Sequence, residues 1–218
     1  MLNLNFNLNL KGKKVAYYIT FLLLLAALTS LALGGYLLIK AHFAQYLLIK
    51  TWQQQTVAGE LKNNREVKPW PWADFYPVAK LSFERFNITQ IVLNNDSGQA
   101  LAFGPGINQI KGALIDRQSA GVVVISAHND THFSILKELR LNDRVKLTLK
   151  SGRTQVFKVD NIAIMDTQTE QLILINDDEQ YDHNNDNKSL IKELVLVTCY
   201  PFNSVNDETK LRYIVYLS

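Results

Sequence analysis

Cysteine is almost absent from this chain: Cys199 is the one cysteine among 218 residues. A single cysteine excludes a disulfide within the chain and a cysteine-rich zinc site. A lone cysteine is most often a small buried hydrophobic residue. Its neighbours in the sequence must therefore decide whether Cys199 has a chemical role.

Acidic residues are missing from the first 59 positions, where five Lys residues occur before the first carboxylate, Glu60. The formal net charge of +3 therefore belongs to the N-terminal segment, since 18 Lys and Arg residues face all 20 Asp and Glu residues beyond it. A nucleic-acid partner would need basic residues clustered on the folded domain. The charge distribution thus argues against nucleic acid as a partner.

Charge of either sign is also missing from the 25 residues between Val15 and Ile39. About 20 helical residues cross the hydrocarbon core of a bilayer, so this run predicts one transmembrane helix at 15–39. A cleaved signal peptide is the weaker interpretation, because its apolar core spans only about 7–15 residues. A buried helix of a soluble protein fits poorly, because the run is apolar on every face.

Lys11, Lys13 and Lys14 precede this run, and the positive-inside rule predicts that their end faces the cytoplasm. Residues 1–14 are then a cytoplasmic tail, which we expect to be disordered. Residues 40–66 form a helical stem or linker, and 67–218 a domain outside the cytoplasm.

The outer domain has the pattern of an all-β fold, with short β-branched and aromatic runs divided by turn residues. The predicted strands are Val78–Phe83, Ile88–Leu93, Ala100–Phe103, Gly121–Ser126, Arg144–Leu149, Thr154–Asp166, Glu193–Thr198 and Leu211–Leu217. The runs 121–126 and 194–198 are largely apolar without alternation, which predicts that both are central strands covered on two faces. One short helix is expected at Phe133–Arg140, capped by Asp130 or Thr131.

The Pro-rich segment 67–77 precedes these strands and predicts an extended arm, because Pro disfavours helix. Trp70 and Trp72 in this arm are expected to pack against the barrel.

Three residues at strand positions form a candidate catalytic group. Cys199 follows the apolar run LVLVT, and His128 follows GVVVISA in the same way. Arg212 lies on the last strand, where it shares a face with Ile214 and Tyr216. A nearby cation activates a thiol, an imidazole can protonate a leaving amine, and a guanidinium can stabilise an oxyanion. Spacing alone makes this a weak signal.

The motifs VTCYPF, GVVVISAHNDTHF and LRYIVYLS, in this order, resemble the sortase family, and the local form is similar to Gram-negative, marine-proteobacterial sortases. The resemblance runs from about Pro69 to Ser218. It implies a closed eight-stranded β-barrel with short helices, preceded here by the transmembrane helix.

The resemblance also implies roles: Cys199 as nucleophile, His128 as acid/base, Arg212 as stabiliser of the transition state or substrate backbone, and Thr198 as a residue lining the substrate groove. Two positions depart from the family pattern. Ala127 stands where Gly is common, which requires a φ below zero or strain. Asn129 stands where a basic residue is expected.

By resemblance, the enzyme cleaves a Leu-Pro-x-Thr-Gly-like C-terminal sorting signal through a thioester and passes the acyl group to an amine. The implied partner is a secreted protein, and the implied location is a bacterial inner membrane with the catalytic domain in the periplasm. No cofactor or metal is expected. Calcium binding by the acidic segment Asn176–Asn187 is less favoured than a solvated loop, since the segment lacks EF-hand spacing. A zinc pair of His128 and His132 is disfavoured because no third ligand is in sight.

Two other functions stay open from sequence alone. One is a membrane-bound cysteine protease that uses water as the acceptor. The other is a non-enzymatic envelope β-module in which Cys199 is part of the core.

Overall fold

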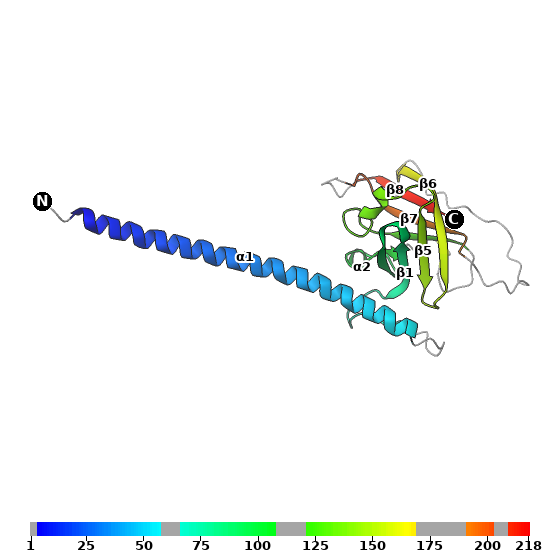
Figure 1. Cartoon of the computed structure of the whole chain (residues 1–218), viewed down its shortest axis with the longest axis horizontal. Helices are drawn as coiled ribbons and strands as arrows, with labels where there is room; N and C mark the ends of the chain where they lie inside the picture. The colour runs from blue at the N-terminus through cyan, green and yellow to red at the C-terminus, as the bar shows by residue number, and fades with distance from the viewer. Residues whose placement is uncertain (1–3, 58–65, 108–120, 169–190, 203–208) are drawn as a thin grey trace, which may run out of the picture. The chain divides into compact units, whose positions relative to one another are not determined.

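A computed structural model describes residues 4–57, 66–107, 121–168, 191–202 and 209–218 (Figure 1). The chain divides into two compact units, residues 1–46 and 47–218. The first unit consists of most of one long helix, and the second contains the end of that helix and a β-barrel.

Helix α1 runs without a break from Leu4 to Val57. The disordered tail expected for residues 1–14 is therefore wrong from Leu4 onward. Gly12–Thr56 is long and apolar enough to cross a membrane, by length and composition. Large apolar side chains such as Leu23, Leu31 and Leu33 are exposed along it. The expected stem is helical to Val57, and its remainder, 58–65, lies outside the described residues.

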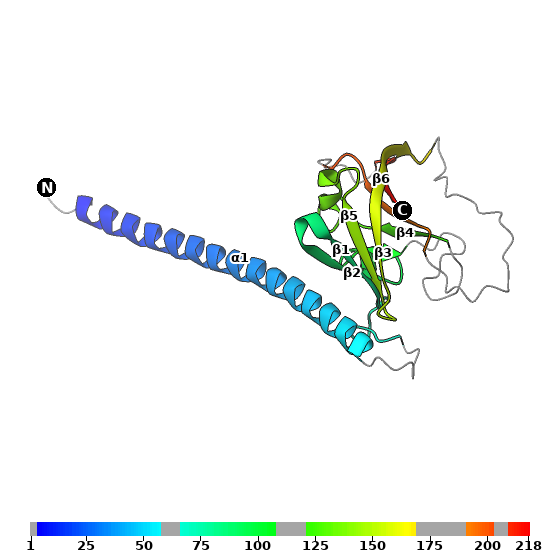
Figure 2. The same ribbon diagram turned by 45° about the vertical axis from the view of Figure 1, so that its right-hand side comes forward.

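Eight strands close into the barrel in the order β1-β2-β3-β4-β7-β8-β6-β5. Figure 2 shows β5 and β6 of this barrel side by side. The pairs β2–β3 and β4–β7 are parallel, and the other pairs are antiparallel. The strands are β1 Pro77–Phe83, β2 Ile88–Leu93, β3 Gly106–Ile107, β4 Val122–Ser126, β5 Arg144–Leu149, β6 Thr154–Asp166, β7 Glu193–Cys199 and β8 Leu211–Leu217. The all-β class and the closed eight-stranded barrel are confirmed.

The strand predicted at Ala100–Phe103 is wrong. The short helix α2 occupies Gly98–Leu101, because the Ser97 side chain accepts from Ala100 N and caps the first turn. The strand in this region is β3, displaced to Gly106, whose missing Cβ allows close approach to the Asn95 backbone.

The helix expected at Phe133–Arg140 is shorter and of the 3₁₀ type. It is η2, Ser134–Glu138, and its N-terminal residue Phe133 makes no side-chain cap. Asp130 and Thr131 therefore do not cap it. A second 3₁₀ turn, η1, spans Glu84–Phe86.

The barrel interior holds the main core, to which every strand contributes, including Leu81, Ile125, Leu147 and Leu196. A second cluster lies around Phe75 and contains Leu48 and Trp52 from the last turns of α1. Trp70 packs edge-on against Phe75 with ring centroids 5.4 Å apart, which confirms its expected packing. Trp72 is 77% exposed, so its expected packing is wrong.

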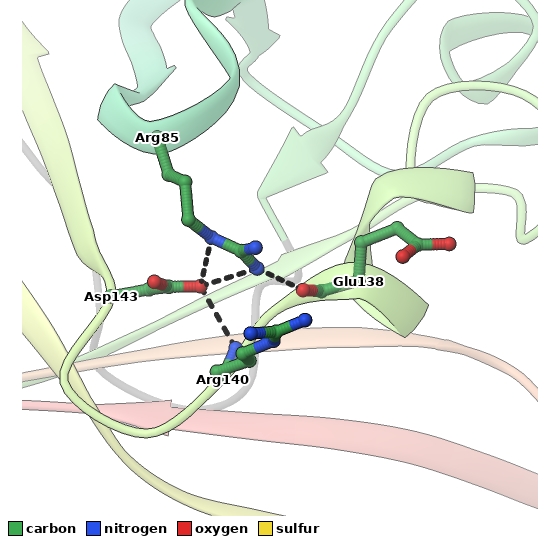
Figure 3. A network of polar contacts seen from close by, with 4 residues as sticks. All are labelled: Arg85, Glu138, Arg140 and Asp143. Atoms are coloured by element: carbon green, nitrogen blue, oxygen red, sulfur yellow. Dashed lines mark hydrogen bonds and ion pairs between the residues drawn. The ribbon is translucent and has the colours of Figure 1, made fainter.

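A polar network fixes the far end of η2 against the barrel (Figure 3). Asp143 Oδ2 accepts from Arg85 Nε at 2.9 Å and from Arg140 N at 2.8 Å, and Arg85 Nη2 also donates to the carbonyl of Glu138. Hydrogen bonds to a charged carboxylate are stronger than neutral ones. The network therefore anchors the C-terminal end of η2, the 3₁₀ turn that follows His128 in the chain.

Candidate active site

Cys199 and Arg212 face each other across the last pair of the β7–β8 ladder. Directly opposite residues in an antiparallel pair have Cβ atoms about 4.5–5.5 Å apart and side chains on one face. The thiol therefore has the first part of the Arg212 side chain as its neighbour. Cys199 is partly exposed and unpaired, as a reactive thiol must be.

Strand alternation places this pair on the outer face of the barrel. Leu194 and Leu196 of β7 point into the main core, whereas Val195 and Val197 belong to a separate cluster with Val124 and Ile214. Cys199 continues the series of Val195 and Val197. The predicted shared face of Arg212, Ile214 and Tyr216 is confirmed by the presence of Ile214 and Tyr216 in this outer cluster.

His128 reaches the same edge of the sheet through the parallel neighbour β4. The β4–β7 register ends at Ser126 opposite Val197, and the last backbone bond runs from Ala127 N to Val197 O at 3.3 Å. His128 is exposed, and its carbonyl accepts from Phe133 N at 2.9 Å. Phe133 is fully buried in the core, so this bond fixes the His128 backbone to a rigid point.

Thr198 is buried directly before Cys199. Its side chain is 2% exposed, and its Oγ1 donates to the carbonyl of Ala127 at 2.7 Å. Thr198 therefore ties the residue before the cysteine to the residue before the histidine. The sequence prediction missed this role because strand alternation turns Thr198 away from the face that carries Cys199.

The two departures from the family pattern have structural explanations. Among the described residues, only Asn87, Asn142 and Gly152 have a positive φ, so Ala127 is not strained by its Cβ. The Ala127 methyl group is buried in the main core. Asn129 Nδ2 donates to the carbonyl of Pro201 at 3.0 Å, which joins the segment after His128 to the segment after Cys199.

The Arg212 guanidinium is held by backbone oxygens. Its Nη1 donates to the carbonyls of Thr209 at 2.6 Å and Leu211 at 3.0 Å. Within the described ranges, no carboxylate forms an ion pair with it. A guanidinium has five N–H donors, so this arrangement leaves donors for a further acceptor.

His132 lies close enough to His128 for their charges to interact. Burial lowers the pKa of His132 below its ordinary value of 6.5, and the charge of His128 lowers it further, while Asp130 opposes the shift. No group of three or more potential metal ligands occurs in the part of the chain that the structure describes. The acidic segment at 176–187, considered for calcium, lies outside the described residues.

Aromatic side chains without a predicted role pack together just after Cys199. Tyr200 stacks on Tyr213 with ring centroids 6.2 Å apart, and Phe202 meets Tyr213 edge-on at 5.0 Å. Burial and the neighbouring Tyr200 raise the pKa of Tyr213 above its ordinary value. The aromatic residues in the sequences CYPF and RYIVY could have predicted this cluster.

A family model for the sortase domain matches residues 81–218, a range that includes Cys199, His128 and Arg212. The chain belongs to the sortase family. Sortase D of Bacillus subtilis is 31% identical over 96 residues, a match that covers 44% of this chain and 41% of the relative. The match thus spans less than half of that curated relative. The family is one of cysteine transpeptidases.

Solved structures also resemble this sortase. A Clostridium perfringens sortase D5 transpeptidase has a TM-score of 0.52 at 15% identity, with 79% of this chain and 95% of that chain covered. The catalytic domain of B. anthracis SrtD has a TM-score of 0.48 at 21% identity, covering 73% and 95%. At such low identity the first of these supports the fold alone.

Proposed function

We propose that this sortase is a membrane-anchored cysteine transpeptidase in which Cys199 is the nucleophile, His128 the acid/base and Arg212 the oxyanion or substrate-backbone stabiliser. The observation that supports the proposal most is the Cys199–Arg212 pair at the end of β7, beside the parallel strand that leads to His128. Rigid strands position reacting groups more closely than loops do.

The proposed reaction has two acyl transfers. The Cys199 Sγ attacks the Thr carbonyl carbon of a Leu-Pro-x-Thr-Gly-like signal, the carbonyl oxygen becomes negative, and the C–N bond then breaks. His128 gives its proton to the departing Gly amine, which leaves a thioester. An acceptor amine attacks this thioester, gives its proton to His128, and releases the Cys199 thiolate.

Arg212 suits the stabilising role because it pairs with Cys199 across the ladder, and its carbonyl contacts hold the guanidinium without neutralising its charge. Preorganised donors at a developing oxyanion contribute about 10²–10³ in rate. Loss of Arg212 should therefore slow the chemical step by about this factor and leave the fold intact.

The anchor and location form a further part of the proposal. The apolar helix fits a single membrane crossing, and Lys13 and Lys14 at its N-terminal end fit a cytoplasmic N-terminus. The catalytic domain then lies in the periplasm of a bacterium with the helix in the inner membrane. Its partner is a secreted protein with a C-terminal sorting signal. No cofactor takes part in the two acyl transfers.

Product analysis tests the transfer step. The full chain in detergent micelles is incubated with Leu-Pro-x-Thr-Gly-type peptides, with and without saturating amine, and the products are identified by mass spectrometry. A transpeptidase gives the new amide, and Cys199→Ala gives neither amide nor acid. Hydrolysis alone at saturating amine would support the cysteine protease instead.

Thiol labelling tests the third function, the non-enzymatic envelope module. That function predicts a folded protein whose Cys199 resists iodoacetamide, because a core thiol is shielded. The transpeptidase requires rapid labelling at the one cysteine of the chain, since its thiol must reach a substrate.

A further inference from the structure

The β4–β7 ladder ends just before the two residues that must cooperate. The last register pair is Ser126–Val197, and the last backbone bond is Ala127 N to Val197 O. Beyond this point the chain carries His128 on one side and Cys199 on the other. Their relative position therefore depends on contacts other than the ladder.

Two side-chain hydrogen bonds cross this gap in opposite directions. Thr198, just before Cys199, donates to the carbonyl of Ala127, just before His128, at 2.7 Å. Asn129, just after His128, donates to the carbonyl of Pro201, two residues after Cys199, at 3.0 Å. The first bond is buried, and the second lies at the exposed rim.

We infer that Asn129 is a positioning residue: its amide joins the loop after His128 to the loop after Cys199 and so sets the approach of the imidazole to the thiol. This inference rests on the proposed roles of His128 and Cys199. The segment after Cys199 is also tied to β8, where Tyr200 N donates to Leu211 O at 3.0 Å. The bond from Asn129 therefore couples His128 to a strand-supported segment.

An amide suits this position better than the basic side chain that the family pattern favours. It donates to a carbonyl at short range without adding a fixed charge beside the imidazole. The same residue thus supplies the bond and adds no charge to the pair.

The test compares neutral substitutions of Asn129 that differ in size and in whether they keep an amide. Asn129→Ala removes the side chain, Asn129→Leu keeps its approximate volume without the donor, and Asn129→Gln restores an amide. Ser134→Ala is the matched control, because Ser134 Oγ donates to Thr131 O at 2.7 Å within the same turn without reaching the Cys199 segment. All are made in the full chain and measured in detergent micelles.

The readout is the rate of Cys199 alkylation by iodoacetamide at pH 7 divided by the rate at pH 10, where thiols in general are ionised. The single cysteine makes the signal unambiguous. We expect His128→Ala to lower this ratio about tenfold, because the side chain proposed to activate the thiol is lost. The ratios of Asn129→Ala and Asn129→Leu should lie between those of the wild type and His128→Ala. The ratio of Asn129→Gln should lie nearer the wild-type value, and Ser134→Ala should keep the wild-type ratio. In turnover of a cleaved peptide, kcat should fall and KM should stay unchanged.

Three outcomes would contradict parts of this account separately. Wild-type ratios in Asn129→Ala and Asn129→Leu, with a lowered ratio in His128→Ala, overturn the role of Asn129 and leave the Cys–His pair intact. If Ser134→Ala lowers the ratio as much as the Asn129 variants do, the role of Asn129 is also overturned, because loss of any hydrogen bond in the turn would then have the same effect. A wild-type ratio in His128→Ala overturns the pair itself and the proposed function with it. If Asn129→Ala fails to fold, the volume-matched Asn129→Leu decides the question.

Discussion

The β4–β7 pair and strand β5 differ in how deeply their outward side chains are buried. In β4 and β7, three consecutive residues on each strand are buried, Val123–Ile125 and Leu194–Leu196. In β5, buried Val145 and Leu147 alternate with partly exposed Lys146 and Thr148. The β4–β7 pair is parallel and covered on both faces, whereas β5 follows the ordinary one-sided pattern.

The difference shows which part of the barrel holds the candidate site in place. The outward residues Val124, Val195 and Ile214 form their own apolar cluster beneath the edge that carries Cys199 and Arg212. The outward residues of β5 make only surface contacts, such as the 3.7 Å pair of Lys146 with Glu84. Outward substitutions should therefore be costly on β7 and tolerated on β5.

The largest contrast is expected for apolar truncation at an outward position. Val195→Ala removes buried methyl groups and leaves a cavity, so we expect a loss of about 2–3 kcal/mol in the free energy of unfolding. Lys146→Ala removes an exposed ion pair and should change it by less than about 0.5 kcal/mol. Urea unfolding of both variants measures the difference. Equal losses would mean that the outer cluster adds no stability.

A smaller contrast is expected from the same polar substitution on the two strands. Thr198→Val removes a buried donor and leaves the Ala127 carbonyl unpaired, so we expect a loss of about 1–3 kcal/mol and a reduced kcat. Thr148→Val breaks only an exposed hydroxyl pair with Thr154, 3.1 Å apart, and should cost less than about 0.5 kcal/mol. A Thr198→Val enzyme with wild-type stability and kcat would argue against the bond.

The smallest expected effect is a pH dependence of stability that arises from His132, in the segment after β4. Burial first, and then His128, lower the pKa of His132 below 6.5 in the folded state. As pH falls through about 6.5, the unfolded chain takes up the proton before the folded protein does, so stability falls with decreasing pH until the lowered pKa is passed. His132→Asn should reduce this decline between pH 8 and pH 5, measured by thermal unfolding. An unchanged decline would assign it to other groups.

The sequence predicted most of the barrel because its apolar runs are long and clearly bounded. The strand at 121–126 matches β4 within one residue, and Leu211–Leu217 matches β8 at both ends. The prediction failed at 100–103, where Ser97 caps a helical turn that a four-residue apolar run cannot reveal. It also missed that Leu48 and Trp52 pack in the barrel unit, since the stem was read as a spacer.

The candidate site was predictable in its chemistry and only partly in its geometry. Sequence reasoning placed Cys199 and His128 at strand ends, and strand alternation placed Arg212 on one face with Ile214. The hydrogen bonds of Thr198 and Asn129 join residues more than seventy positions apart. Such bonds depend on the parallel pairing of β4 with β7, which no local pattern encodes.

The most direct test of the central claim is the intact mass of the full chain after reaction with Leu-Pro-x-Thr-Gly-type peptides. The account predicts a mass increase equal to the acyl fragment, located on Cys199, absent in Cys199→Ala and removed by added amine. A folded protein that cleaves a peptide without any adduct on Cys199, or that still cleaves it as Cys199→Ala, would contradict the claim.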